Sequence, residues 1–445
     1  ILAAACAVAL GFAACARVPA APPVALNRAL QDPPDRVARV SYLEGGVSLR
    51  VAGTNEWTNA NRNRPLTSGD ALWTDAGARA ELHFGSAALR LDAQTELELL
   101  EVGSDAVQVK ITRGTIAVHV RELDEGEEFE IDTPDAALTV QREGDYRVEV
   151  PTDGTWITAR RGLADVTGFG VLRAGQRVRL PAGALSDPAP PDPFDAFCAN
   201  RDRREDQTLA EKRVPPRLVG HEDLDEYGDW QVDVTYGPVW TPRGLPPGWG
   251  PYRFGHWIWV EPWGWVWVDD APWGFAPFHY GRWVFRERWC WVPGPFHRRP
   301  VWAPALVVFV GGGGSGFHFY FRLSIGRGVA WFPLGPHEIW LPPYHASRAY
   351  LTNVNVRNTL VHDPAGLDRF DISRQRYANR HIDGAFTAVP EDVFRRAQPV
   401  DRHRVDISRQ ERDRAVIGGS APPVTPERDS LGSRGEGRVK APPAA

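Results

Sequence analysis

Apolar and polar residues alternate with a period of two through the first part of the chain. The alternation is clear at Val37–Leu43 and Val47–Val51, which flank a Glu-Gly-Gly turn. It recurs, bounded by Gly or Asp, at Ala80–Phe84, Ala88–Leu91, Val107–Ile111, Thr115–Val120 and Phe129–Thr133. This period is typical of half-buried strands, and no segment here keeps a helical period. The pattern predicts an all-β domain over residues 36–180.

The strand patterns of residues 218–362 are short and rich in tryptophan. Gly-x-Trp triplets stand at Gly228–Trp230, Gly255–Trp257 and Gly281–Trp283, at a nearly constant spacing, and each unit ends in a strand such as Trp265–Val268. A fixed spacing with one strand pair in each unit indicates stacked β units. The sequence therefore predicts a Trp-rich region of repeated β-hairpins and strands after the first domain.

Two other stretches lack this apolar period. Residues 181–217 are rich in Pro, Asp and Arg, which predicts a linker with a short helix around Phe194–Arg204. Residues 363–445 are polar and Arg-rich, with Pro, Gly and mixed charge towards the end. Such a composition buries too little apolar surface to offset the entropy of ordering, so we expect a largely disordered C-terminal tail.

The opening segment Ile1–Ala16 is almost wholly apolar and too short to span a bilayer. It suits the apolar core of a signal peptide, so we expect residues 1–20 to be a signal peptide whose basic n-region is missing. The protein is then exported, to the periplasm or in association with the outer membrane. The sequence around Cys15 resembles a lipoprotein processing site, but Ala14–Ala16 also fits ordinary cleavage. Lipid anchoring at Cys15 and plain cleavage both remain open.

The formal net charge of −5 is small for 445 residues, and the basic residues gather in no patch. Binding to phosphates needs such a patch, so we expect no nucleic acid partner. After the signal peptide the chain has no apolar run of bilayer length, and we expect no transmembrane helix in the mature chain.

Two cysteines, Cys198 and Cys290, remain after the predicted signal peptide. An oxidising periplasm would allow one disulfide between them. Two separate buried thiols are the alternative, because bridging demands a restricted geometry.

The strands of the first domain carry a family resemblance. Its motifs follow one another in the order Leu66–Asp70, Trp73–Asp75, Arg113–Val118, Ile131–Pro134 and Ala174–Gln176. Together they resemble the core of a FecR domain, although Arg142–Tyr146 stands where that family has a Gly-Thr pair. The resemblance implies a periplasmic domain that passes a signal from an outer-membrane receptor to a sigma factor through a transmembrane helix. Without that helix, a literal anti-sigma role is not expected.

The Trp-rich region resembles the Trp-rich domain of unknown function that follows a FecR domain in many proteobacterial envelope proteins. Besides the triplets, the resemblance extends through Gly328–Pro336 and Pro342–Tyr344 to Asn353–Asn355. The order of the two domains is its most specific feature, and it implies a family without implying an activity.

The aromatic side chains of the repeats have two interpretations. They form the core of hairpins that contain few Leu or Ile, which is the commoner role of aromatics in repeats. Alternatively, the side chains on one face of each strand form an exposed platform for sugar rings. The candidate platform residues are Tyr252, Trp257, Trp259, Trp263, Trp265, Trp267, Tyr280 and Trp283.

Motifs of catalytic or cofactor sites are weak. Gly311–Gly316 has a nucleotide-type glycine spacing but precedes a strand pattern, where a phosphate site needs a helix. Six histidines lie scattered, without helical pairing, at His256, His279, His297, His318, His337 and His345. Glu261, Asp269 and Asp270 stand among indoles, where spacing alone does not separate catalytic from turn residues. We predict no catalytic residue, no cofactor and no metal site.

These observations leave three hypotheses for the function of the protein. The leading hypothesis is a non-catalytic exported envelope protein that binds or scaffolds, with peptidoglycan, another envelope glycan or an envelope protein as its partner. The first alternative is a periplasmic signalling component that acts with a separate membrane protein. The second is a cell-wall hydrolase, which requires a carboxylate cluster in a cleft of the repeat region.

Overall fold

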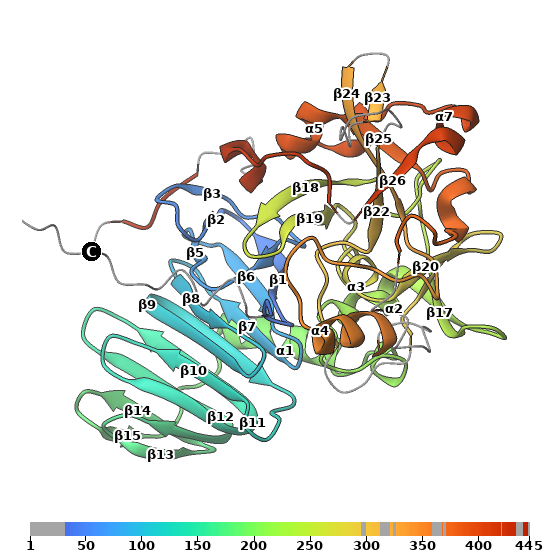
Figure 1. The fold of residues 1–445 in the computed structure, drawn as a ribbon. Coiled ribbons are helices and arrows are strands. Elements are labelled where there is room, and N and C mark those ends of the chain that lie inside the picture. The colour runs from blue at the N-terminus through green and yellow to red at the C-terminus, as the bar shows by residue number, and fades with distance from the viewer. Residues whose placement is uncertain are drawn as a thin grey trace, which may run out of the picture.

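The computed structural model describes residues 32–294, 300–311, 321–323, 326–357, 367, 371–419, 421–432 and 439–443. These residues form an N-terminal β domain and a Trp-rich region on which the C-terminal segment packs (Figure 1). The all-β fold class is confirmed, since strands dominate both parts. The predicted signal peptide and Cys15 lie outside the described residues. Among the described residues, no helix has both the length and the apolar character needed to cross a bilayer.

The N-terminal β domain is one 15-stranded sheet with the order β15-β14-β12-β11-β10-β9-β7-β6-β1-β4, to which β2, β3, β5, β8 and β13 are added at the side. Its pairs are antiparallel except for β9 with β10. The strands are β1 (Ala38–Glu44), β2 (Val47–Arg50), β3 (Trp57–Asn59), β4 (Pro65–Leu66), β5 (Ala71–Thr74), β6 (Arg79–His83), β7 (Ala87–Leu91), β8 (Glu96–Val102), β9 (Ala106–Val120), β10 (Glu128–Asp132), β11 (Ala137–Val150), β12 (Thr155–Val166), β13 (Gly170–Arg173), β14 (Gln176–Leu180) and β15 (Ala184–Ser186).

The long strand β9 joins two parts of this sheet. The sequence predicted two strands, at 107–111 and 115–120, but the chain continues through both as one bent strand. Gly114 lies between them with φ +93°, and a Cβ there would stand 2.3 Å from the Thr95 hydroxyl oxygen. A side chain is therefore excluded at this bend by both backbone conformation and space. The first part of β9 pairs with β8 and β10, and the second part with β7 and β11.

The predicted linker contains α1 (Pro193–Glu205), close to the helix expected at 194–204. Asp192 and Asp195 form a capping box and Pro193 occupies the first turn, which fixes where the helix begins. Helix α1 packs beside β6 and β7 (Figure 1). After it come η2 (Ala210–Lys212), η3 (His221–Asp223) and α2 (Leu224–Tyr227).

Each Gly-x-Trp triplet begins a hairpin, as the repeat predicted. The first strands are β16 (Gly228–Asp233), β18 (Gly255–Val260) and β20 (Arg282–Phe285), and their partners are β17 (Gly237–Pro242), β19 (Gly264–Asp269) and β21 (Trp289–Val292). Tryptophans face each other across all three hairpins in the pairs Trp230–Trp240, Trp257–Trp267 and Trp283–Trp291. The repeat glycine lies under the indole of the partner strand, since a Cβ on Gly228, Gly255 or Gly281 would meet Trp240, Trp267 or Trp291.

The hairpins do not form a uniform stack. Strands β17 and β21 pair and join the outer two hairpins into one four-stranded sheet, whereas β18–β19 is a separate two-stranded sheet. Between and after the hairpins lie α3 (Ala276–His279), β22 (Val307–Gly311), β23 (Phe321–Leu323), β24 (Gly326–Pro333), α4 (Arg348–Thr352) and η4 (Asn353–Arg357). Strand β22 ends at Gly311, where the glycine run begins, and the rest of this run lies outside the described residues.

Part of the segment predicted as a disordered tail is folded. It contains η6 (Ala378–His381), β25 (Thr387–Pro390), α5 (Glu391–Arg395), α6 (Val400–His403), α7 (Arg409–Arg414), β26 (Val416–Gly419) and η7 (Arg428–Leu431). Strand β25 pairs with β24, and β26 pairs with β22. The apolar residues that dock here, such as Val393, Phe394 and Val400, are buried singly or in pairs among charged ones. Their spacing therefore produces no apolar period in the sequence.

Candidate functional site: a buried charge cluster and an aromatic groove

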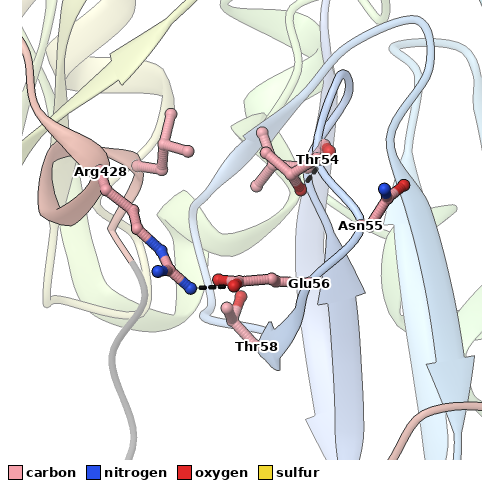
Figure 2. Close-up of a pocket in the computed structure, with 7 residues that line it drawn as sticks. Thr54, Asn55, Glu56, Thr58 and Arg428 are labelled. Carbon is pink, nitrogen blue, oxygen red and sulfur yellow. Dashed lines mark hydrogen bonds and ion pairs between the residues drawn. The ribbon is translucent and has the colours of Figure 1, made fainter.

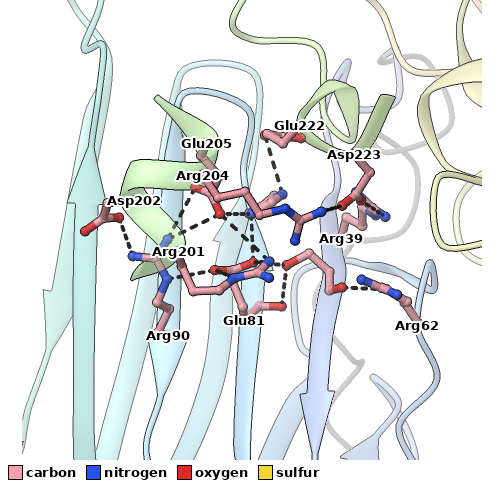
Figure 3. Close-up of polar contacts among 12 residues, drawn as sticks. Arg39, Arg62, Glu81, Arg90, Arg201, Asp202, Arg204, Glu205, Glu222 and Asp223 are labelled. Carbon is pink, nitrogen blue, oxygen red and sulfur yellow. Dashed lines mark hydrogen bonds and ion pairs between the residues drawn. The ribbon is translucent and has the colours of Figure 1, made fainter. Parts of the chain in front are cut away.

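A cluster of buried charges lies between the N-terminal β domain, α1 and η3 (Figure 3). Its centre is His83 on β6, whose Nε2 is 3.1 Å from both Glu81 and Glu205 and whose Nδ1 is 3.4 Å from Glu222. Arg90 on β7 contacts Glu81 at 2.7 Å and Asp202 at 2.6 Å. Three separate segments of the chain thus bring their acids to the polar face of β6.

Further arginines surround this centre. Arg121 reaches Glu205 at 2.8 Å and Glu222 at 3.3 Å, and Arg201 pairs with Glu81. At the side towards the Trp-rich region, Asp223 contacts Arg39 at 2.6 Å and Arg204 at 2.8 Å. The cluster therefore ties the sheet and α1 to the residues that lead into the first Trp hairpin.

The protonation states follow from these contacts. Burial opposes charge on His83, but Glu222, Glu205 and Glu81 outweigh it and raise the pKa of the imidazole well above its usual value. Burial likewise opposes ionisation of Glu81, yet Arg90 and His83 hold the pKa of this carboxyl well below its usual range. The cluster is thus a network of charged partners, with His83 as an imidazolium.

The ligand-type side chains at this centre already have cationic partners in the chain. Glu81, His83 and Glu205 offer ligand atoms within 4.8 Å of one another, which is a metal-like spacing. However, a metal ligand must be a neutral imidazole, whereas His83 is held protonated by three carboxylates. Arg90 and Arg201 also already supply positive charge to the same acids. The arrangement has the chemistry of an ion-pair network that fixes the domains together.

A second acid–base group lies closer to the surface. His119 on β9 contacts Asp145 through Nδ1 at 2.7 Å and Asp206 through Nε2 at 3.4 Å. Burial opposes the charge on His119, but its hydrogen bond to Asp145 raises the pKa of the imidazole. The pKa of Asp145 is held at about 2, against the effect of burial, by His119 and Arg161. This group, too, consists of partners already paired within the chain.

Most of the candidate platform residues are in the core, at an exposure of 5% or less: Tyr252, Trp257, Trp263, Trp265, Trp267, Tyr280 and Trp283. Trp259 alone among the eight is partly exposed. The platform interpretation is therefore wrong for these seven residues, because both faces of β18–β19 are covered. Phe394 of α5 lies 5.2 Å from Trp257 and 4.6 Å from Trp265, measured between ring centroids.

An aromatic groove remains at the end of the β18–β19 hairpin. Trp259, Trp263 and Trp265 line one side of it, Tyr344 lines another, and the segment Ala421–Pro426 closes it. The indole Nε1 of Trp265 donates a hydrogen bond of 3.1 Å to the carbonyl oxygen of Val424. Three of the predicted aromatic residues thus meet at a surface groove, and a segment of the same chain forms its other wall.

We name Ala421–Gly432 the C-terminal strap, because it continues from this groove to the N-terminal β domain. Arg64 donates a hydrogen bond of 2.6 Å to the Leu431 carbonyl oxygen. Figure 2 shows a second pocket where Arg428 of the strap reaches across to Glu56 in the connection between β2 and β3. The strap therefore contacts both parts of the protein.

Of the two alternatives for the cysteines, the structure has the separate thiols, since Cys198 and Cys290 are both free and buried. Cys198 lies in α1 on the N-terminal sheet, whereas Cys290 lies in β21 and contacts Thr241 at 3.3 Å. Burial raises the pKa of the Cys198 thiol to about 12, so this thiol is unreactive at neutral pH.

The carboxylates and histidines among the indoles have structural partners. Asp269 accepts hydrogen bonds from Trp267 Nε1 at 3.1 Å and from the Ala271 amide at 3.0 Å, and burial raises its pKa well above the usual range. Glu261 accepts a hydrogen bond from Trp259. His279 is fully buried, and burial lowers its pKa to about 3, so it is neutral. His297 and His318 lie outside the described residues.

Sequence reasoning missed the charge cluster. Its members come from β6, β7, α1 and η3, and no spacing in the sequence links Glu81 and His83 to Glu205 or Glu222. A weak signal was available in α1, where Arg201, Asp202 and Glu205 stand on a helix of low apolar content. An apolar-poor helix beside a strand that carries Glu and His is consistent with a polar contact between them.

Comparisons with known proteins extend to part of the chain. Two crystal structures of a "putative anti-sigma factor" from Parabacteroides distasonis ATCC 8503 match 30% of this chain at 19% and 18% sequence identity, each with a TM-score of 0.24. The match spans 64% of those chains, less than two thirds of their length, and at this TM-score it carries no argument. No curated protein matches. Residues 221–338, from η3 through the three hairpins, match the model of DUF6600, a family of unknown function.

Proposed function

We propose that this protein is a non-catalytic scaffold of the bacterial envelope that is exported and binds a protein partner. Export is supported by the apolar opening segment and by the FecR-like motifs of the first domain. The carrying observation is that the acids and the imidazole of the charge cluster around His83 are buried and paired with one another. A general acid or base must exchange protons with a substrate, and Glu81, His83 and Glu205 have no such access.

A protein partner fits the exposed surface better than a glycan does. Glycan recognition by stacking needs exposed ring faces, and seven of the eight candidate aromatics are buried. In contrast, Val232 and Val234 stand out at the tip of the β16–β17 hairpin with exposures of 73% and 103%. Exposed apolar side chains that stand together at the tip of a hairpin are suited to a protein contact.

The test places a photo-cross-linking amino acid at Val234, or at exposed Asp153 in the N-terminal β domain as the matched control. We expect a discrete protein adduct in the envelope fraction from position 234 and none from position 153. Purified protein should neither co-sediment with peptidoglycan nor release soluble fragments from it. Co-sedimentation of the wild type that is lost in Trp259→Ala would show that the partner is a glycan and not a protein. Release of soluble fragments would overturn the non-catalytic assignment.

A further inference from the structure

The C-terminal strap packs along the aromatic side chains of the groove, as an extended peptide packs on the surface of a receptor. Pro422 and Val424 are buried against the groove, whereas the side chains of Pro423 and Thr425 are exposed. The Trp265 indole donates to the Val424 carbonyl oxygen, and Trp259 stands at 83° to Trp265 with ring centroids 5.6 Å apart. Aromatic walls with a side-chain donor aimed at a main-chain carbonyl are a known means of recognising extended, proline-rich segments.

The chain contains the same tetrapeptide twice. Ala421–Val424 has the sequence Ala-Pro-Pro-Val, and so has Ala21–Val24. The strap has apolar residues at every second position, Pro422, Val424 and Pro426. The corresponding residues near the N-terminus, Pro22, Val24 and Leu26, are apolar too. Signal-peptide cleavage at Cys15 or after residue 20 would leave Ala21–Val24 on the mature chain.

The first described residues lie next to the groove. The backbone amide and the hydroxyl of Ser347 donate hydrogen bonds to the Asp32 carboxylate, each 2.5 Å long. Ser347 follows Tyr344, which lines the groove, by three residues. Val24 stands eight positions before Asp32, and such a length spans up to roughly 26–29 Å when extended. Ala21–Val24 is therefore tethered within reach of the groove.

From the strap contacts, the repeated tetrapeptide and the tether, we infer that the aromatic groove is a receptor for extended Ala-Pro-Pro-Val segments, with the strap and Ala21–Val24 as alternative occupants. Occupation by Ala21–Val24 releases Val424 from Trp265 and loosens the strap contacts to Glu56 and Arg64. The N-terminal segment thereby controls whether the strap ties the Trp-rich region to the N-terminal β domain. This inference goes beyond the proposed scaffold function and rests on different residues.

The test uses the full chain and a fluorescein-labelled peptide with the sequence of residues 20–27. Anisotropy titrations compare wild type, Val424→Asp, the matched exposed-position control Thr425→Asp, and Val424→Asp combined with Val24→Asp. A tethered occupant acts at millimolar effective concentration, so we expect Val424→Asp to bind the peptide at least about tenfold more tightly than wild type. Thr425→Asp should bind as wild type does. The double variant should bind more tightly still, because both internal occupants are removed.

Two controls define the result. Adding Trp265→Phe to the double variant removes the indole donor and should weaken peptide binding, and a peptide with Asp at the position of Val24 should not bind. A folded double variant, checked by near-ultraviolet circular dichroism, that does not bind the peptide overturns the inference.

A measurement on wild type covers the case in which Val424→Asp fails to fold. Millimolar peptide should increase amide hydrogen exchange at Val424 and Thr425 while β18–β19 stays protected. Unchanged exchange in the strap would contradict the inference. Because both assays use only purified protein and peptide, their failure leaves the envelope cross-link of the proposed function untouched.

Discussion

The N-terminal β domain and the Trp-rich region are both built mainly from antiparallel strand pairs, but they form their cores differently. In β9, Val107, Val109 and Ile111 are buried, while Gln108 and Lys110 between them stay partly exposed. In β19, every residue from Gly264 to Asp269 is buried. Alternation therefore separates an inner from an outer face only where one face of the strand meets water.

The buried faces of β18–β19 are covered by the very segment that the sequence predicted to be disordered. Phe394 lies over Trp257 and Trp265, and Val424 of the strap accepts a hydrogen bond from Trp265. The platform prediction failed because part of the segment expected to be disordered folds onto these indoles. A segment without an apolar period can still contribute single apolar residues to a core that other elements have largely formed.

One strand of the N-terminal β domain is also buried on both faces, one of which is covered by segments distant in sequence. In strand β6, Ala80 and Leu82 point to one face, and Glu81 and His83 point to the other. This alternation predicts an exposed polar face, yet all four residues are buried. Helix α1 and η3 cover the polar face with charged partners in place of an apolar core.

The largest effect is expected from breaking this polar contact. Glu205→Ala leaves Arg90, Arg121 and His83 buried with less opposing charge, so we expect a loss of about 3–5 kcal/mol in the free energy of unfolding. Glu98→Ala, which removes an exposed ion pair with Arg50, should cost less than about 1 kcal/mol. Urea denaturation measures both, and equal losses would mean that the cluster does not join the domains.

The next effect tests whether the C-terminal segment is part of the core. Phe394→Ala removes a ring that is 1% exposed and should cost about 3–5 kcal/mol. Val416→Ala, in the same segment but 48% exposed, should stay within about 0.5 kcal/mol of wild type. Thermal and urea unfolding give the comparison. A negligible loss of unfolding free energy in Phe394→Ala would mean that this segment is disordered, as the sequence predicted.

A smaller, pH-dependent effect should separate the two buried histidines. The raised pKa of His83 means that its stabilisation is complete below its unfolded-state pKa, about 6.5, and is lost as the pH rises through the folded-state value. The stability advantage of wild type over His83→Gln should therefore shrink with rising pH above neutrality. His279→Gln should show no such trend there, because His279, with a pKa of about 3, is neutral throughout. If the stability advantage of wild type over His83→Gln instead grew with pH, the imidazole of His83 would be uncharged in the folded protein.

The smallest expected effect is that of a reductant. With Cys198 and Cys290 both free, adding dithiothreitol should leave the urea midpoint unchanged. A native disulfide would instead contribute about 2–5 kcal/mol, which the same titration would detect as a lower midpoint.

The sequence predicted what local pattern determines. Alternation located β1, β2, β6, β7, β9 and β10 among the fifteen strands of the N-terminal β domain. The sequence also predicted a short helix where α1 lies, and the Gly-x-Trp spacing located three hairpins. It did not predict contacts between distant segments. His83 meets Glu205 and Glu222 only after α1 and η3 pack on β6. Trp265 is covered only when residues more than a hundred positions later fold onto it.

Hydroxyl-radical footprinting of the native protein, read at each tryptophan by mass spectrometry, tests the central comparison most directly. If the Trp-rich region is a two-sided core, Trp259 should be oxidised readily while Trp257, Trp263, Trp265 and Trp267 stay protected until the protein unfolds. Similar oxidation of Trp257, Trp259, Trp263, Trp265 and Trp267 in the native state would contradict this account and return them to an exposed aromatic platform.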